Sequence, residues 1–284
     1  MPGSRLLSRI LEISQKSHLD SVAVAFYDYS ASIRFSYHGD RSFHAASTFK
    51  AGILFALLKA VEAGKVRLDD PLHVRNRFTS IVDGSPYRID RDRDGDVMVH
   101  RHVGRSMPIE SLARVMITRS SNLATNLLLD LLGISFIRTV LEEAGAEGLE
   151  IRRGVEDNVA YQQGINNETT AEGLVRLFRL FLDEDHLPQE LRDKGLEMLL
   201  AQEFKSMIPA RLPAGVRVAH KTGEISTHCH DAGIVFVPDR EPYVVAIMTE
   251  STPSNSKRKK AVADLSAVVH RYVSGCYREE RLHE

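Results

Sequence analysis

A long apolar segment, HAASTFKAGILFALLKAVEAG, runs from residue 44 to residue 64. Because apolar residues fill most positions after Lys50, a helix formed here would be apolar around most of its circumference and has to be buried. Gly64 has the position of a C-terminal cap. Ser47 and Lys50 stand at the start of this segment. They are either a helix cap and a lysine that reaches out to water, or a catalytic nucleophile and its base.

The chain has 284 residues, 43% apolar and 26% charged, enough for one large domain or two interleaved lobes. Its formal charge of −1 gives no reason to expect a nucleic-acid or membrane partner. The basic run at 256–260 is read as the solvated start of a helix. No stretch approaches the ~20 apolar residues of a membrane span, and the first residues lack a secretory signal. We therefore expect a cytoplasmic protein, although a chain trimmed of its signal would look the same.

Strand patterns lie at both ends of the chain, and helical patterns lie between them. An amphipathic helix precedes the first strand. The predicted strands are 21–29, 31–37, 215–223, 232–238 and 241–250, and the later predicted helices are 106–117, with Ser106 as its cap, 122–132, 134–144, 170–182, 188–202 and 256–276. This order predicts an α+β fold with one sheet built from both termini. We expect an α/β lobe of residues 1–46 and 206–284 and a helical lobe of residues 47–205.

The motif Ser-x-x-Lys is common, and the chain contains it three times. Only Ser47 is followed by a strongly apolar helix. At helical spacing Ser47 and Lys50 share one face, within hydrogen-bonding range. The helix N-terminus would stabilise an oxyanion beside Ser47, and a partly desolvated lysine would have a lowered pKa and act as a base at neutral pH.

Two further short motifs follow in order, SSN at residues 120–122 and KTG at residues 221–223. SSN lies where one predicted helix ends and the next begins, and KTG ends a predicted strand. Taken singly, Asn122 reads as a turn residue and Lys221 as a surface strand end. The order Ser-x-x-Lys, Ser-x-Asn, Lys-Thr-Gly is much more specific than any one motif.

With STFK, MITRSSNLATNLLL and HKTG in this order, the chain resembles the penicillin-recognising serine hydrolases, and within them the class A β-lactamases. The resemblance covers nearly the whole chain. It implies the β-lactamase/DD-peptidase-like fold, with an antiparallel sheet from both termini, flanking helices and an inserted all-helical lobe. It also implies an acyl-enzyme mechanism without a metal or an organic cofactor, and we expect a monomer.

The resemblance implies four catalytic side chains. Ser47 would be the nucleophile that is acylated, and Lys50 would take its proton. Ser120 would pass a proton to the leaving nitrogen. Lys221 would supply positive charge beside Ser120 and the substrate carboxylate.

The resemblance also implies a set of groups that bind the substrate. Asn122 would hold its side-chain amide, and Thr222 would hydrogen-bond its carboxylate. Gly223 would let the strand approach closely. The backbone N–H groups of Ser47 and Glu224 would form the oxyanion hole.

The irregular segment 145–169 departs from the family pattern. Class A enzymes carry in this loop a glutamate that activates the deacylating water. If Arg153 matches the family's loop arginine, Val155 takes that position and Glu156 comes one residue late. Glu156 remains the candidate base, and the alternative is a solvated loop carboxylate. Without a base for the water, the acyl-enzyme would accumulate.

A second departure follows the KTG motif, where many class A enzymes have an arginine on the next strand. The chain has His228 and His230 there instead. We assign His230 to carboxylate binding, although a structural role for both histidines is an open alternative. A metal site at residues 228–231 is disfavoured because neighbouring strand residues face opposite sides.

The segment DRDRDGD at residues 90–96 resembles the start of a calcium loop. Its twelfth position is Arg101 rather than a glutamate, and interleaved arginines neutralise its charge. We read it as a charged surface loop near the substrate entrance. The two cysteines, Cys229 and Cys276, are too few for a disulfide framework.

These observations predict a serine β-lactamase acting on a β-lactam or a related small acyl substrate. Two alternatives stay open. One is a cytosolic esterase or peptidase-like hydrolase of the same fold. The other is a penicillin-binding sensor that is acylated without turnover, or a relative without catalysis.

Overall fold

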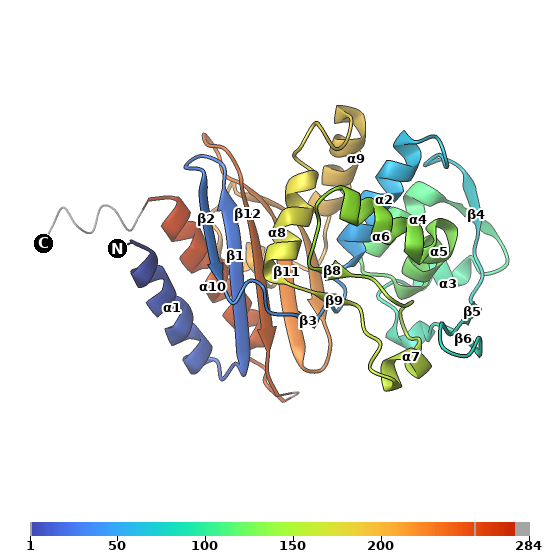
Figure 1. Cartoon of the computed structure of the whole chain (residues 1–284), viewed down its shortest axis with the longest axis horizontal. Helices are drawn as coiled ribbons and strands as arrows, with labels where there is room; N and C mark the ends of the chain where they lie inside the picture. Colours follow the sequence, from blue (N-terminus) through green and yellow to red (C-terminus); the bar gives the residue numbers. More distant parts are fainter. Residues whose placement is uncertain (1, 253, 276–284) are drawn as a thin grey trace, which may run out of the picture.

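A five-stranded antiparallel sheet joins the two ends of the chain in the computed structural model, which describes residues 2–252 and 254–275 (Figure 1). The strand order is β10-β11-β12-β1-β2. Strand β1 pairs along its whole length with β12, from Ser21 opposite Glu250 to Asp28 opposite Tyr243. The strands are β1 (Ser21–Asp28), β2 (Ile33–Tyr37), β10 (Arg217–Glu224), β11 (His228–Phe236) and β12 (Tyr243–Glu250). The prediction of one sheet from both termini is confirmed.

The two faces of the sheet are covered differently because side chains alternate along each strand. On β1, Val22, Val24 and Phe26 belong to the apolar cluster shared with helices α1 (Pro2–Lys16) and α10 (Arg258–Val273). The intervening Ala23 and Ala25 face the larger core and let α8 (Ala171–Leu180) pack closely against the sheet.

The apolar segment of the first motif forms helix α2 (Lys50–Glu62), which is buried nearly all round. The helices α4 (Ile109–Thr118), α5 (Asn122–Leu132), α6 (Ile134–Glu143), α8 and α9 (Gln189–Leu200) surround it. Gly64 follows the helix with φ of 66°, and Lys65 N donates to Ala60 O at 2.9 Å. The expected glycine at the C-terminal end is confirmed.

Helix α2 begins at Lys50, so the expectation that Ser47 opens the α-helix is wrong. Ser47, Thr48 and Phe49 form a tighter preceding turn, in which Lys50 N donates to Ser47 O at 3.3 Å. Left-handed Ala46, with φ of 48°, precedes this turn. The chain therefore enters α2 through a left-handed residue and a turn. A hydropathy pattern cannot show either feature, so it could not locate the first residue of the helix.

The segment 145–169, predicted as irregular, and two other connecting segments contain short elements. Residues 145–169 contribute β8 (Leu149–Glu150), α7 (Asn158–Gln162) and β9 (Glu168–Thr169), and β9 pairs with β3 (Phe43–His44). The segment before α4 holds β4 (Pro71–His73), β5 (Phe78–Thr79), β6 (Pro86–Tyr87), a 3-10 turn η1 (Arg91–Arg93), α3 (Val97–Arg101) and β7 (Ser106–Pro108), and a second 3-10 turn, η2 (Ile208–Arg211), precedes β10.

Most predicted boundaries differ from the structure by one or two residues, and three further differences are larger or change the role of a residue. Ser106 does not cap a helix, because it pairs with His73 in a short ladder and α4 begins at Ile109. Strand β11 begins at His228, four residues early, since its polar residues are buried between β10 and β12. The last helix ends at Val273 in the part of the chain that the structure describes, and Cys276 lies outside that part.

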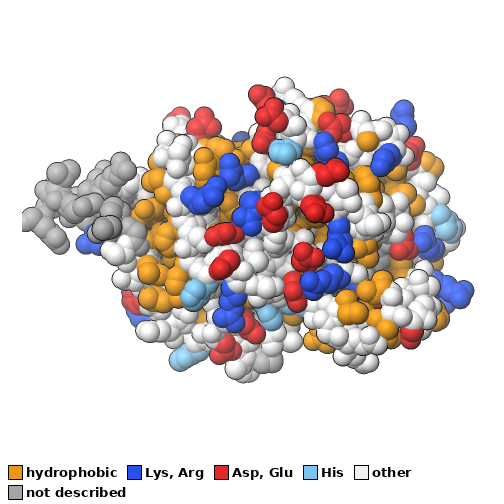
Figure 2. Space-filling model, in the orientation of Figure 1, with side chains coloured by type: hydrophobic (Ala, Val, Ile, Leu, Met, Phe, Trp, Pro, Cys, Tyr) orange, Lys and Arg blue, Asp and Glu red, His pale blue; other side chains and the backbone are white. Residues whose placement is uncertain are grey.

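Positive and negative side chains are interspersed over the face shown in Figure 2. No single helix among the described residues has the length and apolarity of a membrane span. Helices α5 and α6 reach that length and composition only together, and they are bent by 81° at their junction.

Candidate active site

Ser47 lies beside β10, at the junction of two cavities of about 290 Å³ and about 450 Å³. Its side chain is half-buried and lines both. Asn122 and Glu224 also line both cavities, so the two form a continuous cleft on either side of Ser47. At least one residue from each of the three motifs therefore lines the smaller cavity: Ser47, Ser120, Asn122 and Thr222.

Lys50 is fully buried directly behind this cleft. Its Nζ donates to Ser120 O at 2.8 Å, to Ser120 Oγ at 3.1 Å and to Asn122 Oδ1 at 2.9 Å. Burial lowers the pKa of Lys50 to about 7, while the carboxylates of Asp94 and Glu156 oppose that shift. A lysine with this pKa is present as the free base in a large fraction of molecules at neutral pH.

The hydrogen bond expected between Ser47 and Lys50 is absent from the described residues. Lys50 Nζ is instead held by the turn that carries Ser120 and Asn122. Ser47 Oγ accepts or donates no hydrogen bond within residues 2–252 and 254–275, so it is available to a ligand in the cleft.

Ser120 brings the second lysine into the same cluster. Lys221 Nζ donates to Ser120 Oγ at 3.1 Å and to Thr222 O at 2.8 Å. Burial and the charge of Lys50 hold the pKa of Lys221 well below its usual value, opposed by Asp231. Two buried amines therefore share one hydroxyl group, and each disfavours the charged form of the other.

Strand β10 passes close to the backbone of Ser47. A Cβ on Gly223 would lie 2.9 Å from Ser47 N and 3.0 Å from Thr48 N, closer than side chains tolerate. The strand is at the edge of the sheet, and Ile225 N donates to His228 O. Because hydrogen bonding alternates along an antiparallel pair, the N–H of Glu224 faces the open edge beside Ser47.

Both N–H groups of the expected oxyanion hole are thus unoccupied by backbone partners in the described chain. Ser47 N has no acceptor there, and Glu224 N points away from β11. The Glu224 carboxylate pairs with Lys259 at 2.8 Å, and Thr222 lines the smaller cavity beside it. The geometry suits an oxygen atom that gains negative charge beside Ser47.

Glu156 is brought to the cleft rather than to solvent. Its Oε1 accepts from Asn122 Nδ2 at 3.2 Å, and its Oε2 accepts from Asp90 N at 3.0 Å. Its backbone is left-handed, with φ of 62°. A continuous path of hydrogen bonds therefore links Lys50, Asn122 and Glu156.

The preceding residue, Val155, is anchored by its backbone. Val155 N donates to Asn126 Oδ1 at 2.8 Å, and Asn126 Nδ2 donates to Val155 O at 3.0 Å. With Val155 held in this way, the carboxylate that reaches Asn122 comes from the next residue. Asn158, at the start of α7, also lines the larger cavity.

His230 does not reach the cleft, which contradicts its predicted role in binding a substrate carboxylate. Its ring is fully buried, Nδ1 accepts from Thr249 N, and Nε2 donates to His44 O, both at 3.1 Å. Burial lowers the pKa of His230 to about 3, so the ring is neutral. His228, the other candidate, bonds Thr227 and packs beside Phe43. These contacts favour the alternative that His228 and His230 have structural roles.

The cations that line the smaller cavity are Arg93, Arg119 and Lys259. Sequence reasoning missed these three because Arg93 and Lys259 lie in charged stretches read as solvated, and Arg119 directly follows the end of α4. The available signals were the arginines of the 90–96 loop and the basic run at 256–260. Among the described residues, no group of three His, Cys, Asp or Glu side chains is arranged to hold a metal ion.

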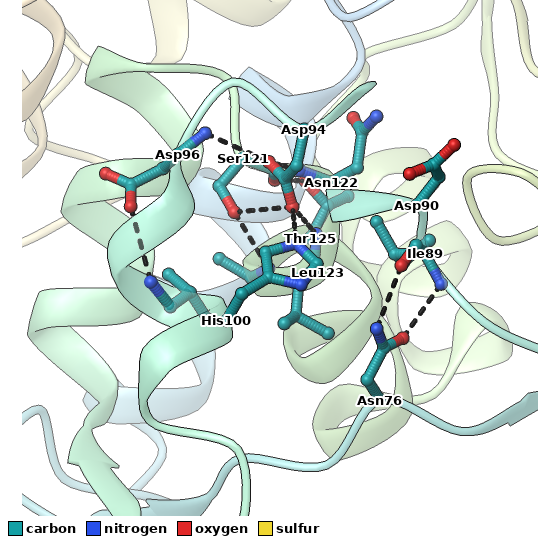
Figure 3. Close-up of polar contacts among 12 residues, drawn as sticks. Asn76, Ile89, Asp90, Asp94, Asp96, His100, Ser121, Asn122, Leu123 and Thr125 are labelled. Atoms are coloured by element: carbon teal, nitrogen blue, oxygen red, sulfur yellow. Dashed lines mark hydrogen bonds and ion pairs between the residues drawn. The ribbon is translucent and has the colours of Figure 1, made fainter. Parts of the chain in front are cut away.

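Sequence reasoning also missed Asp94, which was read as part of a surface loop. Its side chain is fully buried and accepts from Asn122 N and Leu123 N, both at 2.9 Å (Figure 3). Asp94 thus holds the N-terminus of α5, where Ser120 and Asn122 lie. No local pattern could show this, because Asp94 and Asn122 are far apart along the chain.

The sequence of the chain is similar to those of known beta-lactamases. The sequence profile of the beta-lactamase enzyme family matches residues 5–273. A beta-lactamase from Bacillus licheniformis is 28% identical over 241 residues, which is 82% of this chain and 73% of that protein. The extended-spectrum beta-lactamase PER-1 from Pseudomonas aeruginosa is 25% identical over 233 residues, 78% of this chain and 71% of that protein.

A solved structure of PBP-A, in a point variant captured as an acyl-enzyme complex with penicillin G, has the same fold. It superimposes with a TM-score of 0.79 at 26% identity, covering 95% of this chain and 96% of that chain. The predicted fold and the predicted resemblance are therefore both confirmed.

Proposed function

The chain belongs to the beta-lactamase enzyme family, and on that premise we propose that it opens the amide of a β-lactam through an acyl-enzyme formed on Ser47. The single observation that supports the proposal is that Ser120, which lines the same cleft as Ser47, is bound from the buried side by both Lys50 and Lys221. The lowered pKa of Lys50 supports its role as the base.

In the acylation step Ser47 Oγ attacks the lactam carbonyl carbon, and its proton passes to neutral Lys50. The carbonyl oxygen becomes negative beside the N–H groups of Ser47 and Glu224. The C–N bond then breaks, and the nitrogen takes a proton from Ser120 Oγ. The hydroxyl is reprotonated from the lysine amines that lie 3.1 Å from it. Hydrogen bonds of this kind often tighten only when the substrate is bound.

In the deacylation step the ester on Ser47 is attacked by water. Glu156 would take the proton from that water, with Asn122 beside it. The hydrogen bond from Asn122 Nδ2 to Glu156 Oε1 supports this role, because it brings the loop carboxylate to the wall of the cleft. As the water oxygen bonds to the ester carbon, the bond from that carbon to Ser47 Oγ breaks, and Oγ takes back the proton held by Glu156, which frees Ser47 and releases the opened acid.

The substrate carboxylate would lie in the smaller cavity. Thr222 lines that cavity, together with Arg93, Arg119 and Lys259. These cations take the place that the sequence interpretation gave to His230. Positive side chains around a hydroxyl donor suit a carboxylate.

A second candidate function is acylation with little turnover. It is favoured by the one-residue shift that places Val155 where the family has its glutamate, and by the likeness to PBP-A. In this case Glu156 would stabilise the loop through Asp90 N and Asn122 without activating water.

Hydrolysis of a chromogenic cephalosporin tests the proposal. We expect steady release of colour by the wild-type protein and none above background with Ser47→Ala. A single burst equal to the protein concentration would favour acylation without turnover. Activity on a chromogenic ester with none on any lactam would refute the β-lactam proposal.

A further inference from the structure

Asp94 lies outside the three sequence motifs, but its carboxylate makes five polar contacts beside the SSN motif (Figure 3). Its Oδ1 accepts from Asn122 N at 2.9 Å and from Asp96 N at 3.1 Å. Its Oδ2 contacts Leu123 N and His100 Nε2 at 2.9 Å, and Ser121 Oγ at 3.4 Å. The side chain is fully buried. Three of its five contacts go to Ser121, Asn122 and Leu123, so this buried carboxylate has a specific structural task at that turn.

The turn that Asp94 holds is the one that binds Lys50. Ser120 has φ of 60°, a conformation that L-residues other than glycine seldom adopt and that the surroundings have to maintain. Ser120 O and Asn122 Oδ1 accept from Lys50 Nζ. Displacement of the turn would therefore displace the partners of the proposed base.

Ser121, the middle residue of the SSN motif, cannot satisfy all the N–H groups at the start of α5. Ser121 accepts from Ala124 N at 3.2 Å and so satisfies one N–H at the start of α5. The N–H groups of Asn122 and Leu123 would remain without a partner, and Asp94 takes both. A carboxylate at this position is also favoured by the dipole of α5.

We propose that Asp94 is a positioning residue for acylation: its carboxylate, brought in from the 90–96 loop, fixes the Ser120–Asn122 turn against Lys50 and balances the charge of that lysine. The inference rests on the proposed function, because it gives Asp94 a role in the acylation step.

The charge of Asp94 acts in a defined direction. Burial depresses the pKa of Lys50, and the carboxylates of Asp94 and Glu156 raise it. Lys221 faces the same hydroxyl from β10, and His100 contacts Asp94 from α3. Removal of the Asp94 charge therefore destabilises the ammonium form of Lys50 and lowers its pKa further.

Asp94→Asn and Asp96→Asn form a matched pair of variants. Asp96 is also buried, lies on the same loop and caps α3 through Met98 N and Val99 N. Its Oδ2 pairs with Arg119 at 3.3 Å, directly before the Ser120–Asn122 turn, but among the described residues its side chain has no hydrogen bond to Ser120, Ser121 or Asn122 themselves. Each variant loses one buried carboxylate that caps a helix, so a general loss of stability would affect both.

Two readouts separate the proposal from the function on which it rests. The first is the acylation rate constant against pH, measured with a chromogenic cephalosporin. For Asp94→Asn we expect a rate on the order of 10–100-fold lower and an acid limb displaced downward by roughly one pH unit. For Asp96→Asn we expect the acid limb of the acylation rate at the same pH as in the wild type.

The second readout is an NMR titration of the Lys50 side chain, assigned with Lys50→Arg, which needs no substrate. The Lys50 pKa should be lower in Asp94→Asn and unchanged in Asp96→Asn. If the wild type is not acylated, the proposed function fails while this titration still tests the role of Asp94. If Asp94→Asn does not fold, His100→Ala serves instead. It removes one hydrogen-bond partner of Asp94 but keeps the carboxylate charge. We then expect slower acylation, with the acid limb of the pH–rate profile at the same pH as in the wild type.

The proposal is overturned if Asp94→Asn keeps the acid limb and the Lys50 titration of the wild type. An unchanged acylation rate in His100→Ala would overturn it equally where Asp94→Asn is unfolded.

Discussion

Ser120 Oγ lies 3.1 Å from both Lys50 Nζ and Lys221 Nζ, so a single hydroxyl connects two buried amines. Both lysines have lowered pKa values, and burial is the main cause in each case. Protonation of one disfavours protonation of the other. In the proposed mechanism, this arrangement would provide a base for the nucleophile and a proton path to the leaving nitrogen through the same oxygen atom.

The pH dependence of acylation should report Lys50. Because its pKa is lowered to about 7, the neutral base is lost as the pH falls below that value, and kcat/KM should fall with it. Measurement of cephalosporin hydrolysis from pH 5 to pH 9 tests this. Lys50→Arg should be inactive throughout, since a guanidinium keeps its proton. A profile flat down to pH 5 would contradict the assignment.

Lys50 should also destabilise the folded chain at neutral pH. Its folded pKa of about 7 is below the ordinary value of 10.5, so the unfolded chain binds a proton that the folded chain lacks between these values. Lys50 therefore lowers the free energy of unfolding at pH 7. Between the two pKa values this free energy rises with pH, by up to ~1.4 kcal/mol per pH unit. Lys50→Met should be more stable than the wild type at pH 7 by roughly 1–3 kcal/mol.

Urea denaturation at pH 7 and pH 9 measures this difference. We expect the advantage of Lys50→Met in the free energy of unfolding to narrow as the pH rises. The same advantage at both pH values would show that Lys50 is not a displaced titrating group.

Glu156→Gln should separate acylation from deacylation. We expect the acyl-enzyme to form at nearly the wild-type rate and to persist on the order of 100-fold longer. Glu168→Gln is a matched control, because Glu168 lies in β9 at the end of the same segment and pairs with Arg152. Equal lifetimes in both variants and the wild type would mean that Glu156 is not the base for the water.

Gly223→Ala should lower activity by steric displacement. The added Cβ would lie 2.9 Å from Ser47 N, so β10 or the Ser47 turn has to move. We expect kcat/KM to fall on the order of 10–100-fold. Gly215→Ala, at φ of 87° and away from the cleft, should cost stability without that loss. Full activity in Gly223→Ala would show that the close approach is not required.

Much of the architecture was predictable because strong periodicity coincides with burial. The apolar segment after Lys50 forms the central helix, and the strands at both ends of the chain form one sheet. The start of β11 was missed since His230 and Asp231 are buried polar residues with partners on other segments. Hydropathy cannot identify a strand whose polar groups are satisfied over long distances.

The site was predictable only where a residue type and a local motif coincide. Lys50 and Lys221 both bind Ser120 Oγ, and Ser120 lines the same cleft as Ser47, while the catalytic roles of these residues stay predictions. His230 was assigned to the cleft from its position after KTG, but Phe43 and His44 cover its ring, which is buried and bonded to His44 O. Asp94 escaped prediction because its role depends on a contact made across the fold.

The most direct test of the central claim is intact-protein mass spectrometry after rapid mixing with a chromogenic cephalosporin, followed by mapping of the modified peptide. The account predicts a transient adduct on the peptide that contains Ser47, formed as colour is released and absent from Ser47→Ala. Colour release at the wild-type rate by Ser47→Ala, or an adduct on any other residue, would contradict it.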